Sequence, residues 1–193
     1  MKIILASNSP RRKEILDIAK IEYEVIPSNI EEKMNEELPV AERIEEIAYQ
    51  KVKSIRKSRQ DKIILGADTV VLINDKIIGK PHSKKEAEEI IRLLSGKTHK
   101  VITGCCIYDN VKNEYIKFHE ITEVTFYEMS DEEILTYIEN PSIYDKAGAY
   151  GIQEDAALYI EKVNGDYYNI IGLPIGKVFR ELKKISSTRE MVK

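Results

Sequence analysis

The sequence offers few of the side chains from which metal sites and covalent nucleophiles are usually built. Only two cysteines and three histidines occur among its 193 residues. The cysteines, Cys105 and Cys106, are neighbours in a strand-like run, where adjacent side chains point to opposite faces. We therefore expect neither a disulfide between them nor a metal site on them, and this cysteine usage fits a reduced cytoplasmic compartment. The histidines His82, His99 and His119 show no metal-ligand spacing.

Several motifs of known enzyme classes are missing as well. Ser7 and Ser9 lack the GxSxG setting of a nucleophilic serine. Neither a P-loop glycine pattern ending in Gly-Lys-Ser/Thr nor a GxGxxG motif occurs. No apolar run approaches the length of a signal peptide or a membrane span, so we expect no membrane partner. The net charge of −3 argues against nucleic acid as a partner, because a phosphate backbone needs a basic face.

What is present is an alternation of strand-like and helical patterns without internal repeats. Strand-like runs occur at residues 2–6, 23–26, 62–66, 70–73, 101–108, 121–127, 157–163 and 167–171. Helical patterns occur at residues 10–20, 40–59, 84–94, 131–139 and 175–185. The pair Asn74-Asp75 predicts a hairpin turn between 70–73 and a short strand at 76–78. Crossover helices together with hairpins favour an α/β fold with a mixed sheet.

The segment SNSPRRKEIL, residues 7–16, follows the first apolar run and predicts the start of a helix. Ser9 is suited to the N-cap and Pro10 to the first helical position. At about 100° per residue, the expected core face of this helix is formed by Ile15, Ile18 and Ala19.

Two arginines in the first turn of that helix indicate an anion. Arg11 and Arg12 oppose the helix dipole, but they add to the free N–H groups and to the hydroxyl of Ser7 as an attraction for phosphate. The alternative is that both are ordinary surface charges or pair with Glu14 and Asp17.

Lys51 falls in the middle of the apolar stripe of the helix predicted at 40–59. A lysine at such a position is costly unless its ammonium reaches solvent or meets an anion. The commoner outcome is a side chain that snorkels to solvent, and the alternative is a lysine that faces phosphate.

Carboxylates near the strands predict a cation site. Asp68 follows an apolar strand in ILGADTVV and is expected to project from a sheet edge into a cleft rather than to form a turn. Together with Glu31-Glu32 it supplies oxygen ligands of the kind that Mg²⁺ prefers. Lys80 lies on a stiff loop in IIGKPHS and indicates nothing by itself.

The segment DKAGAYGIQ, residues 145–153, combines small residues with one amide. Glycines allow a backbone to approach a flat ligand closely, and the amide of Gln153 can read the donors and acceptors of a base edge. The alternative is a glycine-rich connecting loop.

Taken together, these segments resemble the Maf family of nucleoside triphosphate pyrophosphatases over nearly the whole chain. The matching blocks, in order, are SNSPRR, Glu32, Lys51, GADTVV, GKP, LSGKTHKVITG, DKAGAYGIQ and NIIGLP. The resemblance implies an ITPase-like (Maf/Ham1) α/β fold, with a mixed twisted sheet, flanking helices and a cleft between two lobes. It implies one domain over residues 1–185, followed by a flexible tail at 186–193. It also implies a cytoplasmic enzyme that cleaves a nucleoside triphosphate to the monophosphate and pyrophosphate, a link to cell-division arrest through septum formation, and a homodimer.

Three positions match the subtype that acts on dTTP and UTP. This subtype carries SPRR, GADT and GIQ, which the chain matches with Arg11, Thr69 and Gln153. The chain departs from the pattern at one place, where Glu154 replaces the usual glycine and adds negative charge beside the expected base pocket. A 7-methyl-GTP or non-standard purine pyrophosphatase, and a non-catalytic nucleotide sensor that regulates division, are the alternatives.

The resemblance also implies a role for each site residue. The triphosphate would be clamped by Ser7, Arg11, Arg12, Lys51 and Lys80. Mg²⁺ or Mn²⁺ would be held by Glu32 and Asp68, and Asp68 would orient or deprotonate the attacking water. Thr69 and Gln153 would read the pyrimidine. Which carboxylate acts as the base stays open.

Overall fold

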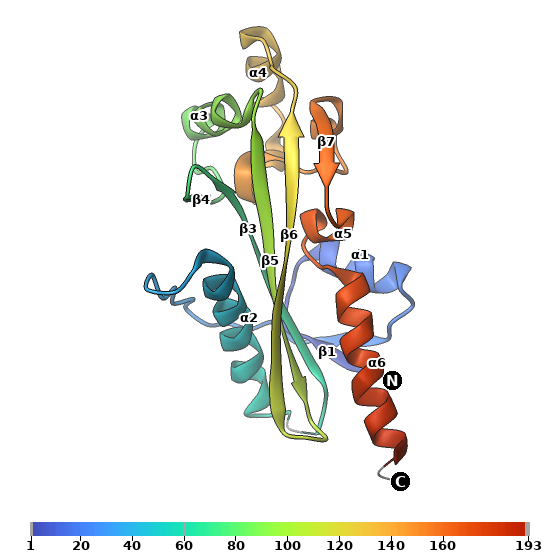
Figure 1. The fold of residues 1–193 in the computed structure, drawn as a ribbon. Coiled ribbons are helices and arrows are strands. Elements are labelled where there is room, and N and C mark those ends of the chain that lie inside the picture. The colour runs from blue at the N-terminus through green and yellow to red at the C-terminus, as the bar shows by residue number, and fades with distance from the viewer. Residues whose placement is uncertain (1, 60, 192–193) are drawn as a thin grey trace. The chain divides into compact units, whose positions relative to one another are not determined.

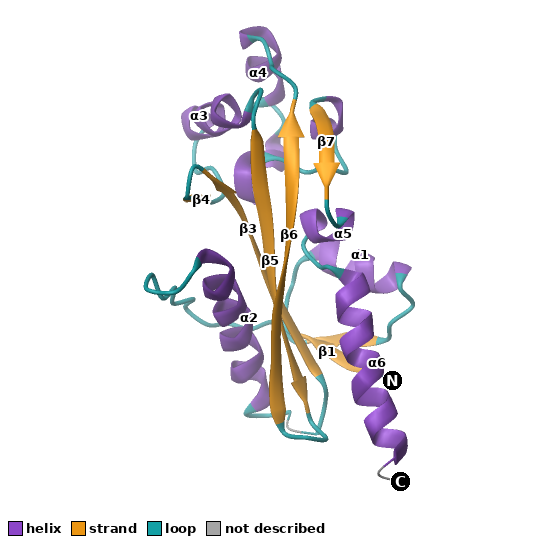
Figure 2. Cartoon of the chain, in the orientation of Figure 1, coloured by secondary structure: helices purple, strands orange, loops and turns teal. Residues whose placement is uncertain are grey.

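The computed structural model describes residues 2–59 and 61–191 and contains a seven-stranded sheet with flanking helices (Figure 1, Figure 2). The strand order is β2-β1-β3-β5-β6-β7, and β4 pairs with β3. Strand β1 runs parallel to β2 and β3, whereas β4 is antiparallel to β3 and β7 is antiparallel to β6. The predicted α/β fold with a mixed sheet and flanking helices is therefore confirmed.

The bounds of most elements overlap the predicted patterns. The strands are β1 (Ile3–Leu5), β2 (Tyr23–Val25), β3 (Ile64–Ile73), β4 (Lys76–Ile78), β5 (Thr98–Asp109), β6 (Glu114–Phe126) and β7 (Ile160–Asn164). The helices are α1 (Pro10–Ile18), α2 (Val40–Arg56), α3 (Lys84–Leu94), α4 (Asp131–Tyr137), α5 (Tyr167–Ile171) and α6 (Ile175–Met191). Short 3₁₀ turns lie at η1 (Pro141–Asp145), η2 (Ala147–Ala149) and η3 (Asp155–Leu158).

The chain divides into two compact units that alternate along the sequence. Unit 1 comprises Met1–Asp68, Thr103–Glu120 and Gly172–Lys193, and unit 2 comprises Thr69–Ile102 and Ile121–Ile171. Strands β3, β5 and β6 each contribute residues to both units. The tail expected at 186–193 overlaps the end of α6, and residues 192–193 lie outside the described residues. Its flexibility, and the cleft that the resemblance implies, stay predictions.

In unit 1, helix α2 lies on one side of the strands, and α1 and α6 lie on the other (Figure 1). The core under α2 is apolar and includes Ile4, Ala48, Val52 and Ile64. Its packing is close because glycines face the helix: a Cβ on Gly66 would stand 2.8 Å from the Ala48 carbonyl oxygen, and one on Gly104 would stand 2.4 Å from the Glu45 nitrogen. Any larger residue at these two positions would push α2 away from the sheet.

The predicted face of α1 is partly wrong. Ile15 is buried as expected, but Ile18 is 56% exposed, and the buried side chains are Arg12, Ile15 and Leu16. The buried face is rotated because the Arg12 guanidinium is itself bonded inside the protein. Ser9 occupies the N-cap position as predicted, yet its side chain makes no capping hydrogen bond.

Unit 2 has its own apolar core, which packs α3, α4 and the 3₁₀ turns against the strands. The predicted hairpin is confirmed, since β4 pairs antiparallel with β3 and Ile73 lies opposite Lys76. Asn74 and Asp75 both have positive φ, of 50° and 58°, as a two-residue hairpin turn requires.

Three predicted strands are corrected by the structure. Residues 64–66 and 70–73 belong to one continuous strand, β3, so that Asp68 lies in mid-strand rather than after a strand. Residues 167–171, predicted as a strand, form helix α5. The carboxylate of Asp166 accepts hydrogen bonds from the N–H groups of Tyr168 and Asn169, and these bonds start a helical turn that the apolar pattern did not reveal.

The two cysteines are free and fully buried. Burial raises the pKa of both thiols, and that of Cys105 rises to about 12. Within the described part of the chain, no helix is both long and apolar enough to cross a membrane.

Candidate active site

The start of α1 carries a buried arginine that is bonded to the hydroxyl of Ser7. The Nη1 of Arg12 donates to Ser7 Oγ at 3.0 Å, and its Nε donates to the Gly172 carbonyl at 2.9 Å. Arg12 is only 9% exposed. Burial lowers its pKa, while the negative charges of Asp68 and Glu32 act in the opposite direction. Arg12 is therefore a fixed internal cation, and its interpretation as an ordinary surface charge is wrong.

The Ser7 hydroxyl accepts two hydrogen bonds and can still donate one. Its oxygen accepts from the backbone N–H of Ser9 at 3.2 Å as well as from Arg12. A hydroxyl has two acceptor positions and one donor, so both acceptor positions are filled. The O–H group of Ser7 is thus suited to donate to an anion.

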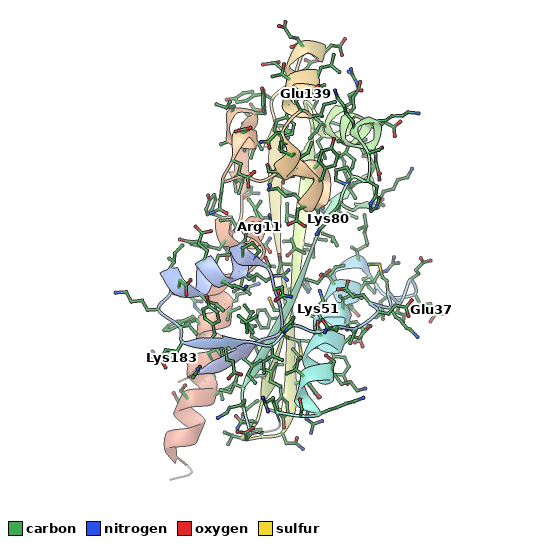
Figure 3. All side chains as sticks on the ribbon, turned by 180° about the vertical axis from the view of Figure 1, so that it is seen from behind. Arg11, Glu37, Lys51, Lys80, Glu139 and Lys183 are labelled. Atoms are coloured by element: carbon green, nitrogen blue, oxygen red, sulfur yellow. The ribbon has the colours of Figure 1, made fainter. Side chains whose placement is uncertain are left out.

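Arg11 lies beside this pair in the first turn of α1 and is partly exposed (Figure 3). Within residues 2–59 and 61–191, no hydrogen bond or ion pair of its side chain is found, so the alternative, a pairing with Glu14 or Asp17, is not formed. Its five N–H donors point to no protein acceptor in the described chain, which makes it the accessible cation of this cluster.

Lys51 projects from α2 and holds two carboxylates (Figure 3). Its Nζ lies 2.7 Å from Asp68 Oδ1 and 2.9 Å from Glu32 Oε1. Lys51 is 8% exposed, so the snorkelling interpretation is wrong. The lysine meets an anion as the alternative required, and in this structure that anion is a pair of carboxylates.

Local structure explains why these groups meet. The parallel register places Leu5 of β1 opposite Leu65 of β3, so Ser7 and Asp68 both follow that pair in the carboxyl direction of the strands. Helix α2 lies close to β3 where Ala48 faces Gly66, and Ala48 lies one helical turn before Lys51. The carboxyl ends of parallel strands are the usual place for ligands in α/β folds. Unit 1 therefore brings together Ser7, Arg12, Glu32, Lys51 and Asp68 as predicted.

The two carboxylates suit a hard divalent cation. Their oxygens converge on one nitrogen, which shows that a single cation can contact both. No group of three or more histidine, cysteine, aspartate or glutamate ligands occurs in the described residues. The carboxylate pair of Glu32 and Asp68 fits Mg²⁺ or Mn²⁺, since Mg²⁺ is typically bound by one or two carboxylates together with water and substrate phosphate.

Three further predicted residues lie in unit 2. Thr69 is half-buried on β3, directly after Asp68. The ammonium of Lys80 pairs with Asp145 Oδ1 at 2.6 Å, and both side chains are exposed, at 55% and 73%. Gln153 is exposed at the end of the segment DKAGAYGIQ, which contains the last residue of η1 and the turn η2 and continues without helix or strand from residue 150 to residue 153.

The sequence interpretation missed several partners in these segments. Asp145 pairs with Lys80, and the buried Lys146 pairs with Glu154. The charged pair Asp145-Lys146 at the start of the segment is the sequence signal that indicates these two ion pairs. The Gly172 carbonyl, which accepts from Arg12, could not be found in this way, because backbone acceptors leave no residue-type signal.

Comparison with known proteins gives one family. The model of the family described as "Maf-like protein" matches residues 2–185. A dTTP/UTP pyrophosphatase of Bacillus cereus is 44% identical over 183 residues, covering 95% of both chains. The dTTP/UTP pyrophosphatases of Bacillus anthracis and Bacillus cytotoxicus are also 44% identical, over 185 and 186 residues, covering 96% of each chain.

A solved structure of a HAM1 protein from Coxiella burnetii is similar to the chain with a TM-score of 0.47 and 17% identity, over 82% of this chain and 91% of the other. The match to the family model over nearly the whole length, and relatives at 44% identity, identify the family. The chain belongs to the Maf family.

Proposed function

We propose that this chain is a pyrophosphatase that hydrolyses dTTP and UTP to the monophosphate and pyrophosphate. The observation that carries the proposal is the ammonium of Lys51, held between Glu32 and Asp68 beside the buried Arg12. The cluster combines carboxylates that can bind a metal ion with cationic donors that can bind phosphate. A metal-bound triphosphate requires both. The 44% identity to proteins named dTTP/UTP pyrophosphatase supports the choice of substrate.

The reaction is an in-line hydrolysis at the α-phosphorus. Water adds to that phosphorus, the bond to the oxygen that bridges the α- and β-phosphates breaks, and pyrophosphate leaves. Asp68 orients the water and accepts its proton. The cationic side chains of Arg11, Arg12 and Lys51 bind phosphate oxygens and stabilise the charge that develops on the leaving pyrophosphate. Ser7 donates its O–H to the same anion.

We assign Mg²⁺ or Mn²⁺ to Glu32 and Asp68. The bound ion would neutralise phosphate charge and lower the pKa of a bound water. We assign Lys80 to the phosphates as a further cation. Thr69 and Gln153 are assigned to the base, where the amide of Gln153 offers a donor to O4 and an acceptor to N3–H of uracil or thymine.

The direct test is product analysis of the purified protein with dTTP, UTP, CTP and GTP in the presence of Mn²⁺. We expect orthophosphate to appear only after an inorganic pyrophosphatase is added, with dTTP and UTP as the best substrates. A nucleoside diphosphate plus orthophosphate as products would contradict the mechanism. Preference for a purine, or normal dTTP turnover by Gln153→Glu in place of a loss of roughly two decades, would contradict only the base assignment.

Three further consequences of the family resemblance stay predictions. These are a role in cell-division arrest, a homodimer and a cytoplasmic location. The first requires a cell-division phenotype of a catalytically inactive variant, which separates it from the hydrolytic activity.

A further inference from the structure

A second lysine that is buried in the described part of the chain, Lys146, lies five residues before Gly151, where the turn that carries Gln153 begins. It is only 5% exposed. Its Nζ donates to the Ser142 carbonyl at 2.6 Å and pairs with Glu154 Oε2 at 2.8 Å. A buried ammonium is tolerated only when it is paired and hydrogen-bonded. Lys146 therefore depends on these partners.

The same contacts hold the turn from Gly151 to Glu154. The N–H of Glu154 donates to the Gly151 carbonyl at 3.0 Å and closes the turn around Gln153. The Glu154 carboxylate also accepts from Ser142 Oγ at 2.7 Å. The stem of Lys146 lies against the other end, since a Cβ on Gly151 would stand 2.7 Å from Lys146 Cε. One lysine thus contacts both ends of the turn.

The segment that precedes the turn is anchored in the core of unit 2. Tyr150 is 5% exposed, and its hydroxyl lies 2.7 Å from His99 Nε2. The hydroxyl of Tyr137 donates to the Ala149 carbonyl at 3.2 Å. Residues 148–150 are therefore buried, whereas Gln153 at the end of the segment is exposed.

Glu154 is the residue at which the chain departs from the pattern quoted for its family. Its negative charge faces Lys146 at ion-pair distance, so that it is balanced within the turn itself. The charge therefore has a structural partner, and it does not act simply as repulsion beside the base.

We propose that Lys146 and Glu154 are positioning residues for base recognition, which fix the turn so that the amide of Gln153 is presented in one orientation. This inference rests on the proposed function, because it assigns Gln153 to the pyrimidine. It makes Glu154 a specificity-determining residue of this chain, acting through the turn rather than by contact with substrate.

The experiment compares wild type, Glu154→Gln, Lys146→Met, the double variant, and Glu139→Gln. The last is a matched control, since Glu139 forms an exposed ion pair with Lys84 in the same unit (Figure 3). The readouts are KM and kcat for UTP and CTP, and amide hydrogen exchange of residues 151–155 without nucleotide. For Glu154→Gln we expect KM for UTP to rise about fivefold with little change in kcat. The preference for UTP over CTP should fall by a similar factor, and exchange should be faster.

The double variant should add little to either single change, as expected for one coupled pair. A wild-type KM and base preference in Glu154→Gln, or a fall in kcat alone, would overturn the inference. If wild type releases no pyrophosphate from any pyrimidine triphosphate, the proposed function fails instead. The exchange measurement then still decides whether the pair holds the turn, even if Lys146→Met does not fold.

Discussion

The two lysines that are buried in the described part of the chain have similar exposure but different surroundings. Lys51 in unit 1 is 8% exposed, and Lys146 in unit 2 is 5% exposed. Lys51 faces two carboxylates, Glu32 and Asp68, whereas Lys146 faces one carboxylate and a carbonyl oxygen. Lys146 and its acid balance each other. The Lys51 cluster therefore contains one more carboxylate than the Lys146 pair, and the buried cation of Arg12 interacts with the same two carboxylates.

The comparison teaches that burial of a lysine does not by itself indicate catalysis. The number and kind of its acceptors distinguish the cluster that we propose as the active site from a structural pair. A carbonyl oxygen satisfies an ammonium without adding net charge, while a second carboxylate supplies a further oxygen of the kind that we propose as a ligand of Mg²⁺ or Mn²⁺.

The largest effect is expected from Asp68→Asn. This change removes a metal ligand and the assigned base while keeping the shape of the side chain. We expect kcat/KM for dTTP to fall by about three decades. Mn²⁺ binding to the free protein, measured by calorimetry, should weaken as well. Asp61→Asn is the control, because Asp61 is an exposed acid of the same unit that pairs with Lys62; a similar loss in that variant would refute the assignment.

Lys51→Ala should lower kcat/KM by about one to three decades. It leaves Glu32 and Asp68 facing each other without their shared cation, so we expect a lower Tm in the absence of metal. Mn²⁺ should then raise Tm more in the variant than in wild type, because the ion no longer competes with an ammonium. In Lys146→Ala, Mn²⁺ should raise Tm no more than it does in wild type. An equal additional increase in Tm in both variants would contradict the assignment of the metal site to the Lys51 cluster.

The smallest effect is expected from His99, which is hydrogen-bonded to Tyr150 in the same unit as Lys146. It changes the free energy of unfolding only below neutral pH. Burial lowers the pKa of His99 to about 4. The unfolded chain takes up this proton near pH 6.5, whereas the folded chain does so only near pH 4. The contribution of neutral His99 to the free energy of unfolding is therefore fully present above pH 6.5 and is lost as the pH falls towards 4. The free energy of unfolding should fall over this range by on the order of 3 kcal/mol from this group.

His99→Gln keeps a polar group for Tyr150 and removes the titration. Urea unfolding at pH 7 and at pH 4.5 should therefore show a smaller difference in the variant than in wild type. Carboxylates titrate in both proteins and cancel in this comparison. The same difference in both proteins would show that His99 is protonated without penalty.

Sequence patterns predicted most elements but not those that depend on one polar contact. Helix α3 was predicted at its observed bounds, because its apolar residues recur with helical spacing and Ser83 caps its start. The strand predicted at 167–171 is a helix because Asp166 caps it, and the face of α1 is rotated because Arg12 bonds inward. In each case a side chain bonded to backbone outweighed hydrophobic periodicity.

Residue identity and order were enough to predict the family, the residue types of the site and the subtype match at Arg11, Thr69 and Gln153. Only the tertiary structure decided which charges meet. Asp68 and Lys51 are 17 residues apart and come into contact because a glycine lets α2 lie close to β3. The pairing of Lys146 with Glu154 likewise depends on a turn between them. Charge partners are set by distance in space, which residue order does not specify.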